Sequence, residues 1–138
     1  MYPKFQWEKN ILKAVEGYPP QFLYFSVPQV FDSIGKFLFE FGSYGSNEGE
    51  FDCPAGVSVN RIGQFIVSDR YNHRVQLFDP TGRFLRAFGC EGRTDGRFNY
   101  PWGIATDSLG FIYVCDKENH RIQVRIFVFN FKLNYISI

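Results

Sequence analysis

The sequence has few of the residues that mark disulfide-rich and metal-binding proteins. Its 138 residues include three Cys, two His and one Met. Cys53, Cys90 and Cys115 are odd in number and form no C-x-x-C pair, which argues against a disulfide framework and against a structural zinc site. We expect reduced thiols, no metal and no cofactor.

Long apolar runs and a strong charge imbalance are also missing. No run approaches the roughly 20 residues that a membrane-spanning helix needs. The N-terminal MYPKFQWEKN lacks the basic-then-apolar order of a secretory signal. The formal net charge is +1. We therefore expect a cytoplasmic protein with no membrane partner and no DNA partner.

Aromatic residues are abundant instead. They make up 20% of the chain and include 17 Phe, while 45% of all residues are hydrophobic. This composition and length fit one globular domain. Aromatic side chains pack well across a pleated surface, so the composition favours an all-β fold.

One stretch of the chain occurs twice. DRYNHRVQLF begins at Asp69 and DKENHRIQV begins at Asp116, an interval of 47 residues. Laying residues 31–77 over 78–124 gives 19 identical pairs in 47. Similarity at a fixed period of this size indicates a repeat architecture.

Each copy contains four short strand signals separated by turn residues. Pro and Gly in Asp79-Pro80-Thr81-Gly82 are suited to a tight turn. Four antiparallel strands per repeat are typical of a β-propeller blade, whose faces are covered by neighbouring blades. The period is too long for leucine-rich repeats, and the WD and kelch signatures are absent. The strands that we expect in the first complete copy are residues 55–59, 64–68, 74–78 and 84–88.

The repeated residues resemble the NHL repeat, a six-bladed propeller module. The pattern is FG-x-x-G-x-x-x-G-x-F-x-x-P-x-G, then an apolar strand ending in Asp, then x-x-NHR-[VI]-Q. The first copy carries it at Gly42, Gly45, Gly49, Phe51, Pro54, Gly56, Asp69 and Asn72-His73-Arg74. The second copy carries it at Gly89, Gly92, Gly96, Phe98, Pro101, Gly103, Asp116 and Asn119-His120-Arg121.

The resemblance implies an all-β, partial NHL-type propeller of four-stranded antiparallel blades, about two blades of a six-bladed ring. A ring cannot close with so few blades, so we expect a fragment of a longer protein. Residues 1–28 are unassigned, with a linker and a degenerate blade both open. Residues 29–124 hold the repeats, divided into the end of one blade (29–50), a full blade (51–97) and three strands of the next (98–124). Residues 125–138 form an aromatic tail that could add an outer strand.

The runs FNYPWG and NHRIQ are most similar to the NHL domains of tripartite-motif (TRIM-NHL) proteins, which repress messenger RNAs. Some members of that family are ubiquitin ligases through an N-terminal RING, whose Cys/His spacing does not occur here. The resemblance therefore implies a non-catalytic module that binds single-stranded or stem-loop RNA in post-transcriptional repression, within a protein of a ubiquitin ligase family.

The repeated motif has a structural interpretation. Each blade needs the same turn between its second and third strands. The Asp can accept turn N–H bonds, the Asn tolerates a left-handed backbone, and the Arg begins the next strand, where it can pair with a carboxylate. We assign this scaffold role to Asp69, Asn72, Arg74, Asp116, Asn119 and Arg121.

The same turn also has a functional interpretation. Neighbouring blades bring equivalent turns to one face, where basic, imidazole and phenol groups suit phosphate contact and base stacking. Between Arg61 and Arg97 there are seven Arg and no Lys against four acidic residues, and Arg both stacks and pairs with phosphate. The resemblance implies RNA contacts at Arg70, Tyr71, His73, Tyr100, Lys117 and His120.

Two other functions stay open. A protein-interaction propeller could recruit a partner, including a substrate for ubiquitination, through the same face or through exposed aromatics. For Trp102 the alternative is core packing near the central channel. A metal-dependent lyase-like propeller could use His73 and His120, but a third ligand is missing.

Overall fold

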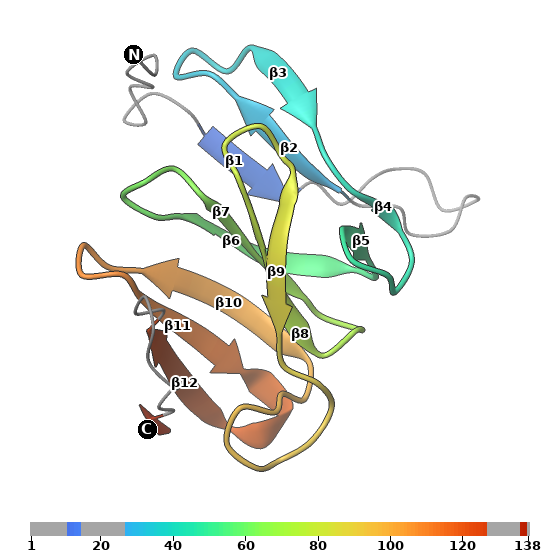
Figure 1. Ribbon diagram of the computed structural model, residues 1–138, viewed down its shortest axis with the longest axis vertical. Helices are drawn as coiled ribbons and strands as arrows, with labels where there is room; N and C mark the ends of the chain where they lie inside the picture. The colour runs from blue at the N-terminus through green and yellow to red at the C-terminus, as the bar shows by residue number, and fades with distance from the viewer. Residues whose placement is uncertain (1–10, 15–26, 127–135, 138) are drawn as a thin grey trace.

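The computed structural model describes residues 11–14, 27–126 and 136–137. Within these ranges the chain is built of β-strands, and its one helical element is the short 3-10 helix η2, Lys117–Asn119. Three larger antiparallel sheets follow one another along the molecule, from the N-terminal to the C-terminal end of the chain (Figure 1). The fold is thus all-β, a partial propeller of antiparallel blades.

The first sheet has the order β1-β2-β3, and a short parallel pair, β4-β5, follows it. Its strands are β1 (Ile11–Ala14), β2 (Pro28–Phe31) and β3 (Phe37–Glu40). The pair consists of β4 (Ser43–Tyr44) and β5 (Glu50–Phe51). Strand β1 lies in the segment left unassigned from the sequence, and β2 and β3 lie in the segment predicted to end a blade.

The central sheet has the order β6-β7-β8-β9, the meander of one complete blade. Its strands are β6 (Pro54–Val59), β7 (Phe65–Asp69), β8 (Arg74–Phe78) and β9 (Phe84–Phe88). The predicted bounds of β8 and β9 are confirmed, and those of β6 and β7 differ by one residue. Every residue of β7 is buried, as a strand covered on both faces requires.

The C-terminal sheet repeats this order as β10-β11-β12-β13. Its strands are β10 (Pro101–Thr106), β11 (Phe111–Asp116), β12 (Arg121–Ile126) and β13 (Ile136–Ser137). Strand β13 pairs antiparallel with β12 at Gln123 and Val124.

The hairpin turns share one hydrogen-bonding device. The Oδ1 of Asp79 accepts the N–H groups of Thr81 and Arg83 at 2.8 and 3.0 Å. The Oδ1 atoms of Asp32 and Asp107 likewise accept the N–H groups two and four residues later in their turns. In the turn between β6 and β7 the acceptor is the Oδ1 of Asn60. Short polar side chains that accept backbone N–H groups stabilise such turns, and the Gly three residues later takes a positive φ.

Two apolar cores separate the three sheets. The core between the first and the central sheet is aromatic, and Phe41 stacks on Phe65 with ring centroids 5.2 Å apart. Its buried members are Val30, Phe41, Phe51, Phe65, Val67 and Phe78. The core between the central and the C-terminal sheet consists of Ile66, Val75, Leu77, Phe88, Phe98, Ile112 and Val114.

The innermost strands of the last two sheets approach closely. A Cβ on Gly56 would collide with the carbonyl oxygen of Trp102, and the Ser68 hydroxyl lies between the two backbones, accepting the Gly56 N–H and donating to that carbonyl. Farther along, the hydroxyls of Ser58 and Thr106 are 3.0 Å apart. The position of Trp102 is therefore fixed by backbone contact with β6.

Candidate functional site

Asp69 is the centre of a buried hydrogen-bond network at the end of β7. It is fully buried, and its Oδ1 accepts the N–H of Asp52 at 2.8 Å. Its Oδ2 accepts from Asn72 at 2.9 Å, from Arg74 Nε at 2.7 Å and from Gln76 at 3.2 Å. Asp69 was expected to accept N–H groups of its own turn, but the N–H that it accepts belongs to the segment before β6.

The same side chains hold the loop that precedes the central sheet. Arg74 donates to the carbonyl oxygens of Ser46, Asn47 and Glu50, each at 2.8 Å. The amide of Gln76 donates to the Glu50 carbonyl and accepts the N–H of Gly49. Backbone groups that a turn leaves unpaired are thus satisfied by side chains of a strand more than 20 residues later.

The second repeat reproduces the network. Asp116 is also fully buried and accepts the N–H of Asn99 at 2.7 Å and Arg121 Nε at 2.7 Å. Asn119 and Gln123 donate to the same carboxylate at 2.9 and 3.0 Å. The geometry of both copies is that of a structural device, since every one of these polar groups is used within the fold.

The charge of Asp69 is set by opposing effects. Burial raises the pKa of Asp69, and the N–H of Asp52 with the donors Asn72 and Arg74 acts in the opposite direction. Burial dominates. An ionised Asp69 consequently depends on the surrounding donors, and removing the acceptor would leave those buried donors unsatisfied.

The left-handed backbone position of each motif is the His and not the Asn. His73 has a φ of 52° and His120 a φ of 54°, so the prediction for Asn72 and Asn119 is wrong. The side chain of Asn72 is held by the Gly45 carbonyl and by Asp69, as that of Asn119 is by Gly92 and Asp116. His is among the residues that tolerate the left-handed region, so it can adopt the backbone conformation at which the chain reverses.

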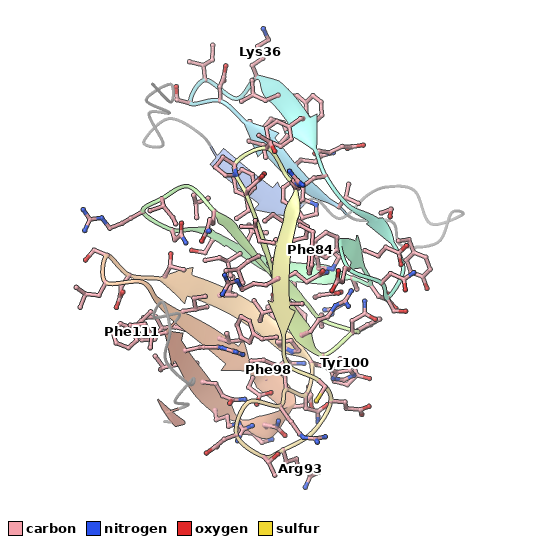
Figure 2. The ribbon with its side chains drawn as sticks, viewed as in Figure 1. Lys36, Phe84, Arg93, Phe98, Tyr100 and Phe111 are labelled. Carbon is pink, nitrogen blue, oxygen red and sulfur yellow. The ribbon has the colours of Figure 1, made fainter. Side chains whose placement is uncertain are left out.

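Tyr100 contacts this reversed turn from the neighbouring repeat. It also has a positive φ, 54°, and its N–H donates to His73 Nδ1 at 3.2 Å. The rings of His73 and Tyr100 have centroids 4.6 Å apart, and the ring of Tyr71 meets that of Tyr100 edge-on at 5.6 Å. Tyr100 lies at the molecular surface just before β10 (Figure 2).

Trp102 continues the same surface with two cations. The guanidinium carbon of Arg70 lies 4.5 Å from the Trp102 ring centroid and 4.7 Å from that of Tyr71. Lys117 Nζ lies 5.1 Å from the Trp102 ring. These distances fall within the range of cation–π attraction. We call this set, Arg70, Tyr71, His73, Tyr100, Trp102 and Lys117, the aromatic–basic cluster.

Five of the six residues predicted to contact RNA lie in the aromatic–basic cluster. The sixth, His120, lies outside the cluster: it follows η2 in the equivalent turn one repeat later, where its N–H donates to the Lys117 carbonyl at 3.1 Å. Trp102, for which core packing was the alternative to an exposed position, is 42% exposed. Trp102 lies two residues after Tyr100, which was already a candidate for RNA contact. This spacing could have indicated that Trp102 belongs to the same surface.

The cluster exposes its rings and part of its charge. Tyr71 is 50% and Tyr100 39% exposed. Lys117 pairs with Glu118 at 2.9 Å across a solvent-accessible surface, which offsets its charge locally. Arg70 donates to Cys53 Sγ at 2.8 Å, so the thiol that replaces Tyr100 in the earlier repeat contacts the guanidinium. This surface can stack flat groups and attract anions.

The described residues also bear on metal binding and on membrane crossing. No three His, Cys, Asp or Glu side chains of these ranges are grouped so that they could hold a metal ion. His73 uses its Nδ1 for the Tyr100 N–H. The ranges described also contain no helix of the length and apolarity needed to cross a membrane.

Known proteins match parts of the chain. Residues 51–78 and 98–124 match the family model described as NHL repeat. B-box type zinc finger protein ncl-1 of Caenorhabditis elegans is 49% identical over 37 residues, which are 27% of this chain and 4% of ncl-1. E3 ubiquitin-protein ligase TRIM71 of Rattus norvegicus is 49% identical over 43 residues, 31% of this chain and 5% of that protein.

Protein brain tumor of Drosophila melanogaster is likewise 49% identical over 37 residues, 27% of this chain and 4% of that protein. A solved structure of a protein of unknown function from Bacteroides caccae has a TM-score of 0.56 at 15% identity, and the match covers 81% of this chain and 38% of that one. The curated matches span only 4 to 5% of the relatives' lengths. The chain therefore carries two NHL repeats, which form a binding module in the central and C-terminal sheets of a partial β-propeller.

Proposed function

We propose that the chain is a non-catalytic module that binds single-stranded or stem-loop RNA through the aromatic–basic cluster, and that it serves post-transcriptional repression of messenger RNA in the cytoplasm. The observation that carries the proposal is the contact of the Trp102 ring with both Arg70 and Lys117, on a surface that also exposes the rings of Tyr71 and Tyr100. The similarity to TRIM-NHL proteins supports the same function and a place within a ubiquitin ligase family.

The proposed contacts follow from the chemistry of the cluster. An aromatic side chain that stacks on a base contributes about 1–3 kcal/mol. Arg70 and Lys117 suit the phosphates that link such bases. Because the Tyr100 N–H is directed at His73 Nδ1, this nitrogen must carry a lone pair. In the neutral ring the proton is then on Nε2, where it can donate to a base edge.

The scaffold limits the entropy that binding would cost. The turn that carries Arg70, Tyr71 and His73 lies between the buried Asp69 and Arg74, whose hydrogen bonds fix both ends of the turn. Trp102 is fixed through its backbone contact with β6. Side chains held before binding lose less freedom on binding.

Recruitment of a protein partner, including a substrate for ubiquitination, is the second candidate. Trp, Tyr and Arg are the residue types that dominate binding energy at protein interfaces. Arg70 contacts the rings of both Tyr71 and Trp102. The two candidates use one surface, so the deciding experiment must measure RNA directly.

The test uses the double variant Arg70→Glu/Lys117→Glu and a matched control, Lys36→Glu/Arg61→Glu. The control changes one Lys and one Arg in exposed turns at the ends of the strands opposite the turn that carries Arg70. Lys36 lies far from Tyr100 (Figure 2). Binding of a fluorescent, random-sequence single-stranded RNA is measured by anisotropy at several salt concentrations. Circular dichroism checks that each variant is folded.

We expect the cluster variant to lose RNA binding and ultraviolet crosslinking. The milder Arg70→Gln/Lys117→Gln should reduce the slope of log affinity against log salt by about 1.4, because each phosphate contact on a single strand contributes about 0.7. The control should bind as the wild type does. Equal RNA binding by all variants would reject the RNA proposal and favour a protein partner.

A further inference from the structure

Four hairpin turns in the described part of the chain share one design, and three of them carry an aliphatic residue at the same position. The N–H groups of Ile34, Ile62 and Leu109 donate to the Oδ1 of the Asp or Asn two residues earlier, at 3.0, 3.2 and 2.9 Å. Thr81 occupies this position in the fourth turn. A polar residue therefore fits there, and the turn itself does not require Ile or Leu.

The aliphatic side chains of these turns extend into solvent. Ile34 is 86%, Leu109 75% and Ile62 66% exposed, the three highest values among the large hydrophobic side chains that the structure describes. Single exposed apolar residues are common, but here the most exposed ones share one position of one kind of turn. Ile62 and Thr81 are exposed although the central sheet packs against a sheet on each face. The exposure therefore does not depend on how many sheets stand beside a turn.

The three aliphatic residues lie on one side of the molecule. The turns between β2 and β3, between β6 and β7, and between β10 and β11 project from the same side (Figure 1). The last two are in contact, because Arg61 Nη1 donates to the carbonyl oxygen of Ser108 at 3.4 Å. The turn that displays Arg70 is at the opposite ends of the strands. We call Ile34, Ile62 and Leu109 the aliphatic tips.

The charges that accompany the aliphatic tips at the surface are positive. The exposed charged residues of the four turns are all basic, namely Lys36, Arg61 and Arg83. The acidic residues of the turns are half-buried, namely Asp32, Asp79 and Asp107. Each of these carboxylates accepts two backbone N–H groups of its own turn. This side of the molecule thus presents aliphatic groups and cations together.

We propose that the aliphatic tips enter the interfacial region of a lipid bilayer that contains anionic lipids, with Lys36 and Arg61 at the level of the phosphates. Protein interfaces rely on Trp, Tyr and Arg as anchors, and Leu is under-represented among them. Aliphatic side chains gain from leaving water without a shaped partner, and Lys and Arg are attracted by anionic headgroups. The contact places the protein on the membrane and needs no segment that crosses it.

The first test measures sedimentation with vesicles of phosphatidylcholine that contain about 30% phosphatidylserine. The wild type should be half-bound below about 1 mM lipid, within the range of a single acyl chain. Ile34→Ser/Ile62→Ser/Leu109→Ser should weaken binding more than about a hundredfold, because burial of each aliphatic side chain contributes about tenfold or more. The control Leu85→Ser/Ile122→Ser changes one Leu and one Ile on strands, 42% and 39% exposed, and should bind as the wild type does.

The second test concerns the cations. Lys36→Glu/Arg61→Glu should weaken binding to the phosphatidylserine vesicles by at least about 25-fold, because each Lys or Arg near an anionic surface contributes about fivefold. Binding of the wild type should weaken with added salt and on vesicles of phosphatidylcholine alone. The same variant is the control of the RNA experiment, where it should bind as the wild type does, so the two activities fail separately. Circular dichroism checks that each variant is folded.

The third test reports whether a tip enters the bilayer. Ile62→Trp should add a blue shift of the emission on vesicles beyond that of the wild type, and Ile122→Trp, on a strand, should add none. A wild type that sediments with neither kind of vesicle overturns the proposal, and the aliphatic tips then belong to the site of a protein partner. Vesicle binding that survives the loss of all three aliphatic tips, or equal shifts for the two Trp variants, also overturns it, because the contact then lies elsewhere.

Discussion

Replacing Asp69 by Asn tests whether the repeated motif is a scaffold. The change keeps the size of the side chain but replaces one carboxylate oxygen by an NH₂ group. If the amide oxygen keeps the Asp52 N–H, the new NH₂ group faces the donors Asn72, Arg74 and Gln76. Arg74 also loses its buried ion-pair partner at 2.7 Å.

The expected loss is large for a domain of this size. Removing one partner of a buried ion pair costs about 3–5 kcal/mol. A chain of 138 residues should then melt about 10–20 °C lower. The loss comes from buried donors without an acceptor and not from the charge alone, because burial already raises the pKa of Asp69.

The assay is urea unfolding at one fixed protein concentration, with two companions. Asp116→Asn disturbs the equivalent network one repeat later and should cost a similar amount. Asp95→Asn is the control, because the Asp95 side chain is 66% exposed and lies 3.7 Å from Arg121. An exposed pair of this kind contributes less than about 1 kcal/mol. An Asp69→Asn variant as stable as the Asp95→Asn variant would refute the scaffold interpretation.

Two further predictions concern the sheets and turns. Gly56→Ala should lower the free energy of unfolding in urea by about 1–3 kcal/mol, because the new Cβ would meet the Trp102 backbone. The equivalent Gly103→Ala should be tolerated, because the nearest neighbour of its Cβ is Cys115 Cβ at 3.8 Å. Equal losses of stability in the two variants would contradict the close packing at Gly56. Desolvation opposes the ionisation of Asp79, but the bonds from Thr81 and Arg83 outweigh it and lower its pKa below 3.8. Its contribution is therefore present above pH 3.8 and lost as the pH falls through the folded-state value, so the stability difference between wild type and Asp79→Asn should narrow between neutral and strongly acidic pH.

The sequence predicted the strands well because their signals are local. The turn residues from Asp79 to Gly82 separate two alternating runs, and the strands on either side have the predicted bounds. The 47-residue period then placed the same elements in the next sheet. Strands β1 and β13 lie outside the repeat, so the period could not locate them.

The details of the site depend on contacts between distant residues. Asn72 and His73 both tolerate a left-handed backbone, and the choice is made by the bond from Asn72 to the Gly45 carbonyl, 27 residues earlier. The exposure of Trp102 depends likewise on Arg70 and Lys117, which approach it from two different sheets. A single sequence gives the turn that displays these side chains but not the partner that each one meets.

The bonds from Arg74 and Gln76 to the loop of residues 45–50 bear on protein engineering. They join a loop to the sheet that follows it, so the smallest self-sufficient module does not begin at the first residue of an inner strand. Consensus arrays or chimaeras divided just before Pro54 would separate acceptors from their donors. A division before Ser43 keeps both on one exchangeable segment, and modules joined there should be the easier ones to recombine.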